Sequence, residues 1–520
     1  MNREEMMRQI RDDSILWDLI IIGGGATGIG VAVDAASRGY RPLLLEQSDF
    51  GKGTSSRSTK LVHGGVRYLQ QGNVSLVLEA LKERGLLRQN AAHLVHDLPF
   101  VVPVYDWWEG PFYGIGMRLY DRLAGKLGFG NSINLSREET IKRLPTIETE
   151  GLRGGVVYHD GQFDDARLVI NLAQTALEQG ATVLNYVKVR EFRKKSGILS
   201  AVVAVDEETG DSHTVWGKVI VNATGVYTDA VRKLDDPTCP SMIKPSQGVH
   251  ILLDKSFLPS ETALMVPHTD DGRVLFAIPW HGRVVVGTTD TPVDETPLEP
   301  CALEEEIEFL VSHTARYLTH DPTREDVLSV FAGLRPLVSV SDGEENTAAI
   351  SRDHTLSLSR SGLLTIAGGK WTTYRKMAED TVDQAIQIAG LEPEPCETHN
   401  LNIHGHHHHA EKFGQLEPYG SDAAFVEKVI CEQDSFSDYL PGSDSIRAGQ
   451  VVWAVRNEMA RTVEDFLSRR TRMLILDARS SMKAAPIVAE LMAAELGHGA
   501  GWVSEQVEQY TELANGYLAV

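Results

Sequence analysis

The stretch that decides the fold is WDLIIIGGGATGIGVAVDAASRGYRPLLLEQ, residues 17–47. Residues 19–22 form a continuous apolar run, which is typical of a strand buried inside a parallel sheet. Small and apolar side chains follow from residue 29 to residue 36, and Gly39 ends this helical segment. Residues 42–45 are apolar again and lead into an acidic residue. The stretch therefore predicts a strand, a helix and a second strand, the opening unit of a Rossmann-like α/β domain.

Three glycines lie between the first strand and the helix, at Gly23, Gly25 and Gly28. In such a G-x-G-x-x-G turn the first glycine permits the tight turn and the second lets a pyrophosphate approach the backbone. The third lets the helix pack closely on the strand, and the helix N-terminus faces the negative charge. Glu46, at the end of the second strand, suits the two ribose hydroxyls of an adenosine. The pattern predicts dinucleotide binding rather than a merely close-packed turn, without choosing between NAD and FAD.

Length and charge set wider limits on function. The chain has 520 residues, a formal net charge of −22 and a hydrophobic content of 42%. A chain of this length forms roughly two or three domains. The acidic balance argues against a nucleic-acid partner, because phosphate backbones attract clustered lysine and arginine.

Several features bear on the compartment. Four cysteines occur, at Cys239, Cys301, Cys396 and Cys431. They form no C-x-x-C pair and suggest no disulfide framework, as in reduced cytoplasmic proteins. Residues 1–14 carry charges of both signs without the apolar core of a signal peptide. Asp18, Asp34 and several glycines interrupt the apolar residues 15–36, so we expect no transmembrane segment there. We therefore expect a cytoplasmic protein.

The rest of the chain predicts a second sheet and a helical tail. Apolar or alternating runs recur at residues 155–158, 182–184, 201–205, 218–222, 250–253, 274–278, 284–286 and 363–366. Few helices separate these runs, although residues 168–178 and 369–388 have helical spacing. A mixed, largely antiparallel sheet is therefore expected beside the first one. Residues near 400 are polar and aperiodic, like a linker, and residues 401–520 predict an all-α C-terminal domain.

A second unusual stretch is TSSRSTKLVHGGVRYL, residues 54–69. It gathers hydroxyl side chains with Arg57, Lys60, His63 and Arg67 in an otherwise acidic protein. A solvated loop is one interpretation, and a site for a phosphorylated ligand is the other. The segments VNATG (221–225), VGTTD (286–290) and IAGGKWTTYRKMAED (366–380) also end strands with Thr or Gly. Together they fit one extended cofactor that contacts several segments.

With these motifs in view, the sequence resembles the FAD-dependent, quinone-linked glycerol-3-phosphate dehydrogenases, within the glycine-oxidase/D-amino-acid-oxidase-like flavoprotein superfamily. The resemblance runs in order over residues 17–380. It is carried by the glycine turn, residues 54–69, DDARLV (164–169), VNATG, IPW (278–280), VGTTD, GLRPL (333–337), SRDH (351–354) and GGKWTTYRKMAED. It extends to the tail through AVRNEMARTVEDFLSRRTR, residues 454–472.

The resemblance implies a domain division. An FAD-dependent oxidoreductase domain would occupy residues 1–400, and the C-terminal helical domain residues 401–520. The FAD-binding parts would lie at about 17–80, 155–235 and 345–390, and the substrate-binding parts at about 81–154 and 236–344.

The resemblance also implies the reaction and the site. A hydride would pass from C2 of sn-glycerol 3-phosphate to FAD, and the electrons would pass on to membrane quinone. FAD contacts would come from Gly23, Gly25, Ala26, Thr27, Gly28, Glu46, Thr54, Ser55, Ser56, Lys60, Leu61, His63, Gly64, Gly65, Thr224, Gly225, Thr289, Asp290, Gly369, Lys370 and Thr372. The catalytic residues would be His63, His250, Arg335, Arg352 and Lys370, and the substrate would contact Arg67, Arg335 and Arg352.

Elementary chemistry agrees with these residue types. A phosphate dianion suits the planar guanidinium fork, so arginine serves better than lysine. Pairing of Arg335 and Arg352 with structural carboxylates such as Asp342 or Asp353 is the alternative. Removal of the C2 hydroxyl proton needs a base. His63, His250 and Lys370 are the candidates, and the sequence does not decide which of them is the base.

The same residues are compatible with more than one function. Oxygen could replace quinone as acceptor, the substrate could be an amine or a 2-hydroxy acid, or the chain could be a flavin-bound sensor or binding subunit without turnover. Residues 107–128 suit either core packing or binding to the inner face of the cytoplasmic membrane as a peripheral protein. A homodimer is compatible with the sequence. The histidines His404 and His406–His409 lie in a polar linker without ligand spacing, so no metal site is expected.

Overall fold

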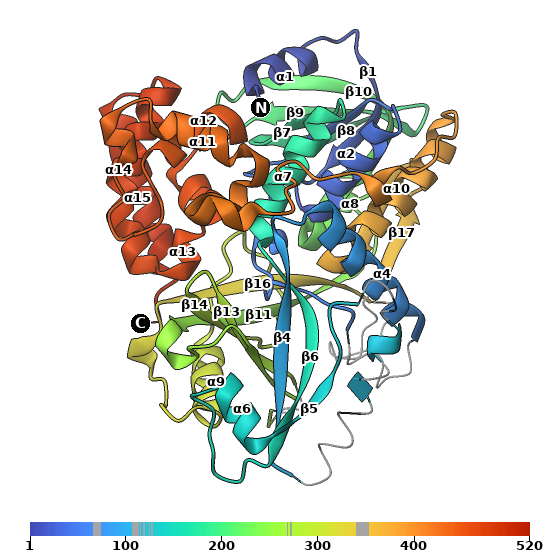
Figure 1. Cartoon of the computed structure of the whole chain (residues 1–520). Coiled ribbons are helices and arrows are strands. Elements are labelled where there is room, and N and C mark those ends of the chain that lie inside the picture. The colour runs from blue at the N-terminus through green and yellow to red at the C-terminus, as the bar shows by residue number, and fades with distance from the viewer. Residues whose placement is uncertain are drawn as a thin grey trace.

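The structure is a computed structural model that describes residues 1–65, 74–106, 114, 116–117, 120–123, 125, 128–267, 269–270, 273–339 and 353–519. Figure 1 shows three parts: a sheet with helices on its faces at the top, a long curved sheet below it, and a group of helices, coloured orange and red, along one side.

The first sheet is built around a parallel core. Its strands are β1 (Leu16–Ile22), β2 (Pro42–Leu45), β7 (Thr182–Leu184), β8 (Val187–Lys195), β9 (Ile198–Asp206), β10 (Ser212–Asn222), β17 (His354–Leu358) and β18 (Leu363–Gly368). The order is β17-β18-β10-β1-β2-β7, with β9 paired to β10 and β8 paired to β9. Strands β18, β10, β1, β2 and β7 are parallel. Their buried, apolar sequences follow from the helices that cover both faces.

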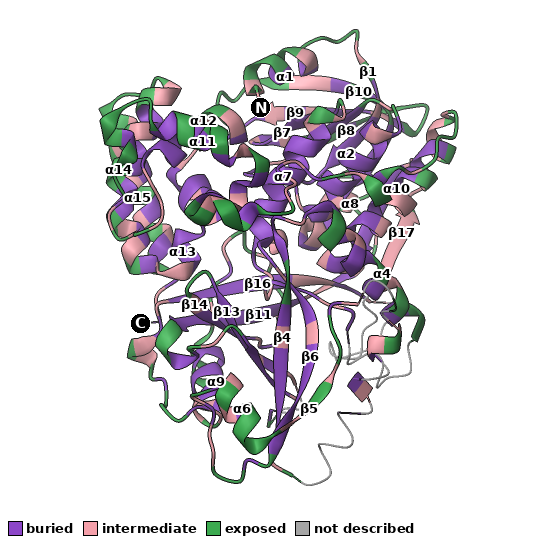
Figure 2. Cartoon of the chain, viewed as in Figure 1, coloured by how far each residue is buried: buried purple, intermediate pink, exposed green. Residues whose placement is uncertain are grey.

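The helices of this part are α1 (Arg3–Ile10), α2 (Ala26–Ser37), α4 (Val74–Asn90), α7 (Asp165–Glu178), α8 (Thr228–Asp235) and α10 (Tyr374–Ala389). Helix α2 is made of small residues because it packs closely on its neighbours: a Cβ on Gly30 would lie 2.9 Å from the ring of Tyr374 on α10. Asp164 caps α7 by accepting a hydrogen bond from the backbone N–H of Arg167. Figure 2 shows α2 and α7 almost wholly buried.

The second sheet is mixed and largely antiparallel. Its strands are β3 (Leu61–Val62), β4 (Val95–Val104), β5 (Ile133–Ser136), β6 (Gly154–Phe163), β11 (Ile243–Asp254), β12 (Ala263–Val266), β13 (Leu275–Trp280), β14 (Arg283–Gly287), β15 (Thr291–Pro292) and β16 (Ser329–Val338). The order is β15-β11-β14-β13-β12-β4-β6-β3, with β16 added to β11 and β5 to β6. Helices α6 (Arg137–Arg143) and α9 (Glu304–Ala315) lie at its lower end (Figure 1).

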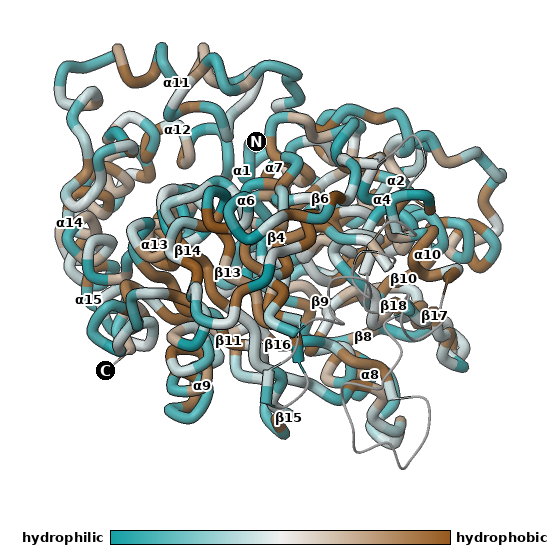
Figure 3. Tube along the Cα trace, turned by 60° about the horizontal axis from the view of Figure 1, so that its bottom comes forward, coloured by the Kyte–Doolittle hydropathy of each residue, from teal (hydrophilic) through white to brown (hydrophobic). Residues whose placement is uncertain are grey.

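The C-terminal part is helical. Its elements are the 3-10 segment η8 (Ala410–Asp422), α11 (Ala423–Ile430), α12 (Gly449–Glu458), the π-helix η10 (Asp465–Arg470), α13 (Met473–Leu476), α14 (Ala478–Leu496) and α15 (Ala500–Asn515). One hydrophobic cluster joins these helices to a face of the second sheet: Phe100 and Leu252 pack in it with Val451, Phe466 and Val488. Figure 3 shows that hydrophobic residues are concentrated in central strands such as β13 and β14.

The expected fold class is confirmed: an α/β nucleotide-binding part, a mixed sheet and an all-α C-terminal part. The exact domain bounds remain a prediction, and β6 and β3 are strands of the second sheet although the expected FAD-binding parts include them. Among the helices in the described ranges, none is long and apolar enough to cross a membrane. Most of residues 107–128, the candidate membrane segment, lies outside those ranges.

Candidate active site

A cavity of about 950 Å³ lies between the two sheets. Its upper wall is formed at the carboxyl ends of parallel strands by Ile22, Leu45 and Ala223, and its lower wall includes His250 of β11 and residues 333–337 of β16. Ligands of open α/β sheets bind at this edge, because the loops that leave the carboxyl ends diverge there.

The glycine turn forms one end of the cavity. Gly23 has a φ of +111°, and a Cβ at that position would lie 2.6 Å from the carbonyl oxygen of Ala223. A Cβ on Gly28 would lie 1.9 Å from the carbonyl oxygen of Gly23, so the third glycine serves the packing of α2 and does not line the cavity. Gly25 is the N-cap of α2 and has no side chain, which leaves the helix start open to an anion.

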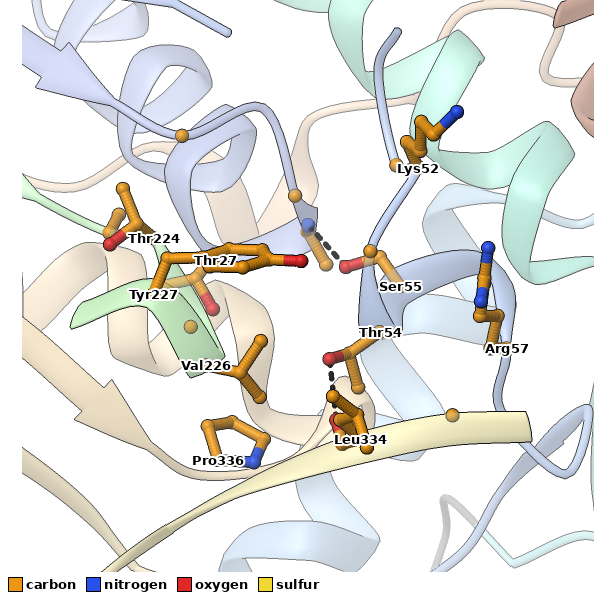
Figure 4. Close-up of a pocket in the computed structure, with 18 of the residues that line it drawn as sticks. Thr27, Lys52, Thr54, Ser55, Arg57, Thr224, Val226, Tyr227, Leu334 and Pro336 are labelled. Carbon is orange, nitrogen blue, oxygen red and sulfur yellow. Dashed lines mark hydrogen bonds between the residues drawn. The ribbon is translucent and has the colours of Figure 1, made fainter. Parts of the chain in front are cut away.

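The loop after β2 lies beside this turn. The carboxylate of Glu46 accepts hydrogen bonds from the backbone N–H groups of Gly24 at 2.6 Å and Ser48 at 2.8 Å. Ser55 accepts a hydrogen bond from the backbone N–H of Ala26 at 2.9 Å. Thr54 donates to the carbonyl oxygen of Leu334 at 2.6 Å, which ties the loop to the second sheet (Figure 4). The hydroxyls at 54 and 55 are thus fixed beside the helix start.

The lower wall holds the guanidinium of Arg335. One of its nitrogens, Nη2, donates to the Thr288 hydroxyl at 3.1 Å and to the carbonyl oxygen of Thr289 at 2.9 Å. The other, Nη1, donates to the carbonyl oxygen of Gln247 at 3.2 Å and lies 3.3 Å from the carboxylate of Asp290. Three of these four acceptors are neutral groups, so they fix the orientation of the guanidinium without adding negative charge.

His250 lies near this arginine. Its Nε2 is 2.9 Å from the Thr59 hydroxyl, and its ring stacks on Phe331 with centroids 4.7 Å apart. Burial, together with the cations of Lys60 and Arg335, holds the pKa of His250 well below its usual value of 6.5. The imidazole is therefore neutral at physiological pH.

The third wall comes from the segment after β18. Gly368 and Gly369 have φ angles of +76° and +77°, and Lys370 is the N-cap of the short helix η6 (Trp371–Thr373). Trp371 donates from its indole nitrogen to the carbonyl oxygen of Ser55 at 2.8 Å. The backbone N–H of His63 donates to the Thr372 hydroxyl at 3.2 Å. Segments more than 300 positions apart are joined by these two bonds.

The structure brings most of the expected residues to one cavity. Those that line it are Gly23, Gly25, Ala26, Thr27, Glu46, Thr54, Ser55, Leu61, His63, Thr224, Gly225, His250, Arg335, Gly369, Lys370 and Thr372. Those that do not line it are Gly28, Ser56, Lys60, Gly64, Gly65, Thr289 and Asp290. Arg67 and Arg352 lie outside the described residues.

Lys60 is the clearest correction. Its side chain is fully buried, and its Nζ lies 2.9 and 2.8 Å from the two carboxylate oxygens of Asp165 and 2.8 Å from the carbonyl oxygen of Ser56. A lysine with no exposed surface must be paired, and here the helix α7 supplies the partner. Its cation is therefore taken by the protein and not by a ligand in the cavity.

Thr289 and Asp290 lie next to Arg335 but do not line the cavity. The Thr289 hydroxyl donates to Glu306 at 2.8 Å and accepts from the backbone N–H of Val249 at 2.9 Å. Asp290 faces Arg335 and Ser246. Both residues position the wall that carries Arg335. A Thr-Asp pair at the end of a strand has the same sequence whether it contacts a ligand or other residues of the protein.

Sequence reasoning missed one end of the cavity. Residues 187–190 of β8, with Glu207 and Tyr227, line it as well. No motif marks β8, which reaches the cavity because the backbone N–H of Val187 donates to the carbonyl oxygen of Glu46 at 2.7 Å. Only this pairing of distant segments reveals the contribution.

Comparisons with known proteins agree with this geometry. Residues 18–375 match the family described as FAD dependent oxidoreductase, and residues 363–505 match the C-terminal domain of alpha-glycerophosphate oxidase. The mitochondrial glycerol-3-phosphate dehydrogenase of Schizosaccharomyces pombe is 36% identical, over 99% of this chain and 89% of that protein. The human mitochondrial enzyme is 37% identical, over 99% of this chain and 75% of that protein.

A solved structure agrees over nearly the whole chain. The glycerol-3-phosphate dehydrogenase from Bacillus halodurans, complexed with FAD, superposes with a TM-score of 0.81 at 30% identity and covers 99% of this chain and 97% of that one. This chain belongs to the FAD-dependent glycerol-3-phosphate dehydrogenase family.

The cavity of this glycerol-3-phosphate dehydrogenase family member fits FAD. At Gly23 and Gly28 any side chain would collide with backbone, as the tight turn and the close helix packing of a dinucleotide-binding unit require, and Gly25 leaves the helix start open to a pyrophosphate. Glu46 would hold the ribose, Ser55 and the start of α2 the pyrophosphate, and the wall of His63, Lys370 and Thr372 the flavin.

Proposed function

We propose that this protein oxidises sn-glycerol 3-phosphate to dihydroxyacetone phosphate and passes the electrons to membrane quinone. FAD, when bound, supplies the acceptor for the hydride that leaves C2. The single observation that carries the proposal is Arg335, a guanidinium fixed at the cavity wall beside His250. The dehydrogenase names of relatives 36–39% identical to this chain support the substrate.

Arg335 would bind the phosphate. Its acceptors at Thr288, Thr289 and Gln247 are neutral groups that hold the guanidinium at the cavity wall, where its positive charge can attract a phosphate. Each charge-assisted hydrogen bond to the phosphate would contribute about 1.5–3 kcal/mol. Arg67 and Arg352, outside the described residues, are proposed as further phosphate contacts on the basis of the family resemblance.

Proton removal from the C2 hydroxyl requires a neutral base on the same wall. His250 is neutral because burial and nearby cations lower its pKa. His63 also lines the cavity. We propose that one of these two imidazoles accepts the proton and that Lys370 orients the substrate or the flavin. The pH profiles of His63→Asn and His250→Asn proteins distinguish them, because the variant without the base loses the acid limb of the profile.

Quinone is proposed as the acceptor because relatives 36% and 37% identical to this chain are named dehydrogenases. The L-alpha-glycerophosphate oxidase from Mycoplasma pneumoniae is only 15% identical, and this likeness concerns the fold alone. A quinone acceptor requires access to a membrane, so we propose a peripheral association with its surface, and a homodimer is compatible with this arrangement. The relatives from Schizosaccharomyces pombe and human are mitochondrial, whereas the sequence predicts a cytoplasmic protein here.

The test is anaerobic reduction of the bound flavin. Addition of sn-glycerol 3-phosphate to the oxygen-free yellow protein should bleach the flavin band, whereas glycerol, amino acids and 2-hydroxy acids should not. A soluble quinone should then restore the colour faster than oxygen does. A band that glycerol 3-phosphate leaves unchanged would refute the proposed substrate, and faster recovery in oxygen would indicate an oxidase.

A further inference from the structure

The loop at residues 46–55 has two faces. One face lines the cavity through Glu46, Ser48, Thr54 and Ser55. The other face carries Asp49, whose side chain is fully buried and does not line the cavity. What holds Asp49 therefore holds the back of the cofactor-binding loop.

Asp49 is held by two consecutive arginines of the C-terminal π-helix η10. Arg470 donates from Nη1 to Oδ2 at 2.6 Å and from Nη2 to Oδ1 at 3.0 Å. Arg469 donates from Nε to Oδ2 at 2.5 Å. Burial alone would oppose ionisation, but these two cations hold the pKa of Asp49 at about 2. The contact spans 420 residues of sequence and excludes solvent from all three side chains.

A second bridge runs parallel to the first. Lys52, on the same loop, donates from Nζ to the carboxylate of Glu464 at 2.5 Å. The other oxygen of Glu464 accepts from Arg469 at 2.7 Å, so both bridges converge on one arginine. Figure 4 shows the Lys52 side chain directed away from the cluster formed by Thr27 and Tyr227. Lys52 also lines the cavity, and its ammonium is paired with Glu464 and, at 3.3 Å, with Glu299.

We propose that Asp49, Arg469 and Arg470, with the Lys52–Glu464 pair, are positioning residues through which the C-terminal helical part fixes the cofactor-binding loop and so determines how slowly FAD dissociates. A buried carboxylate is restrained strongly, because a displaced charge would lose its partners without reaching water. This assigns a role to the tail motif at residues 454–472. The inference rests on FAD as the ligand of the cavity and not on the proposed substrate.

The test measures FAD release from the intact holoenzyme by the rise of free-flavin fluorescence after dilution. Asp49→Asn should accelerate release by about tenfold, the effect expected when one member of a coupled buried network is removed. The matched control is Asp34→Asn. Asp34 is also fully buried and pairs with an arginine, Arg38, at 2.6 Å, but it does not line the cavity or contact the loop. Its release rate should stay within about twofold of the parent.

A second variant keeps the inference testable if Asp49→Asn does not fold. Arg470→Lys retains the charge but loses the two-pronged contact, so an increase in FAD release smaller than that of Asp49→Asn is expected. With excess FAD the KM for glycerol 3-phosphate should stay unchanged in both variants. Unchanged release in the folded variants, or equal acceleration in Asp34→Asn, would overturn the inference. Since no turnover is needed, failure of the proposed substrate would leave this result intact.

Discussion

Two arginines of this protein show how differently the same side chain is held at a cavity wall and inside the fold. Arg335, at the cavity wall, keeps 21% of its side chain exposed and donates to carbonyl and hydroxyl groups, with a carboxylate at 3.3 Å. Arg470, at the C-terminal interface, has no exposed side-chain surface and makes a two-pronged contact with Asp49. The first arrangement orients a guanidinium at the edge of a cavity, whereas the second buries and neutralises it.

Two histidines, His250 and His404, differ in the same way: their surroundings shift their pKa values in opposite directions. His250 is buried at the cavity wall, and its pKa is lowered by burial and by the cations of Lys60 and Arg335. His404, where the linker meets α7, places Nδ1 2.6 Å from Glu178 and Nε2 2.7 Å from Asp422. Both ring nitrogens face carboxylates and must donate, so this imidazole is a cation, and its pKa is raised by these two carboxylates against the opposing effect of burial. Neighbours rather than burial alone decide the charge.

The largest effect is expected at Arg335, the arginine of the cavity wall. Arg335→Gln should lower kcat/KM for glycerol 3-phosphate on the order of a thousandfold, because the phosphate loses its cationic partner at the cavity wall. Steady-state kinetics with excess FAD measure this loss, and flavin absorbance checks that FAD is retained. Arg456→Gln, at a surface ion pair of the C-terminal part, is the control and should have parental kinetics. An Arg335→Gln protein with the parental KM would show that Arg335, like Arg470, does not bind the substrate.

For the free energy of unfolding, the larger effect is expected at Arg470 and the smaller one at Arg335. Arg470→Gln should lower the free energy of unfolding by about 3 kcal/mol, because Asp49 is left buried without its bidentate partner. Arg335→Gln should lower it by less than about 1 kcal/mol, because this side chain borders a cavity. Urea denaturation followed by circular dichroism compares them at saturating FAD. Equal losses would show that both arginines act mainly on the fold.

A smaller effect concerns pH and His404. Since its folded-state pKa is raised above 6.5, the stability it contributes is fully present below pH 6.5 and is lost as pH rises through the raised pKa. The difference in unfolding free energy between the parent and His404→Gln should therefore shrink above pH 6.5, by about 1 kcal/mol or less. Thermal unfolding across this range measures it. A difference that grows with pH would contradict the cationic assignment.

The matching prediction for His250 has the opposite sign. Its folded-state pKa lies below 6.5, so the unfolded chain takes up a proton first as the solution is acidified. Stability is therefore lost as pH falls from 6.5 toward the lowered pKa. His250→Asn should lose less stability than the parent over that acid range. Thermal unfolding with excess FAD measures the two slopes, and parallel slopes would mean that the pKa of His250 is not lowered in the folded protein.

The sequence predicted the cofactor turn well because its signals are local. Gly23, Gly25 and Gly28 act through backbone geometry within a few residues, and the apolar strands on either side are continuous in the chain. Thr54, Ser55 and Arg335 were found through motifs and a family resemblance, and the structure places all three at the cavity. Lys60 was misassigned because a cation between hydroxyls has the same sequence whether its partner is a phosphate or the distant Asp165.

By itself the sequence determined the α/β start, the mixed second sheet, the helical tail and the acidic character of the chain, because strand and helix periodicity and glycine geometry are properties of neighbouring residues. The tertiary structure decided which charges are already neutralised. Asp49 meets Arg470, and Lys52 meets Glu464, only after the chain has folded back over more than 400 residues. Long-range pairing of this kind leaves no periodic signal, and it is what distinguishes the arginine buried in the fold from the arginine at the cavity wall.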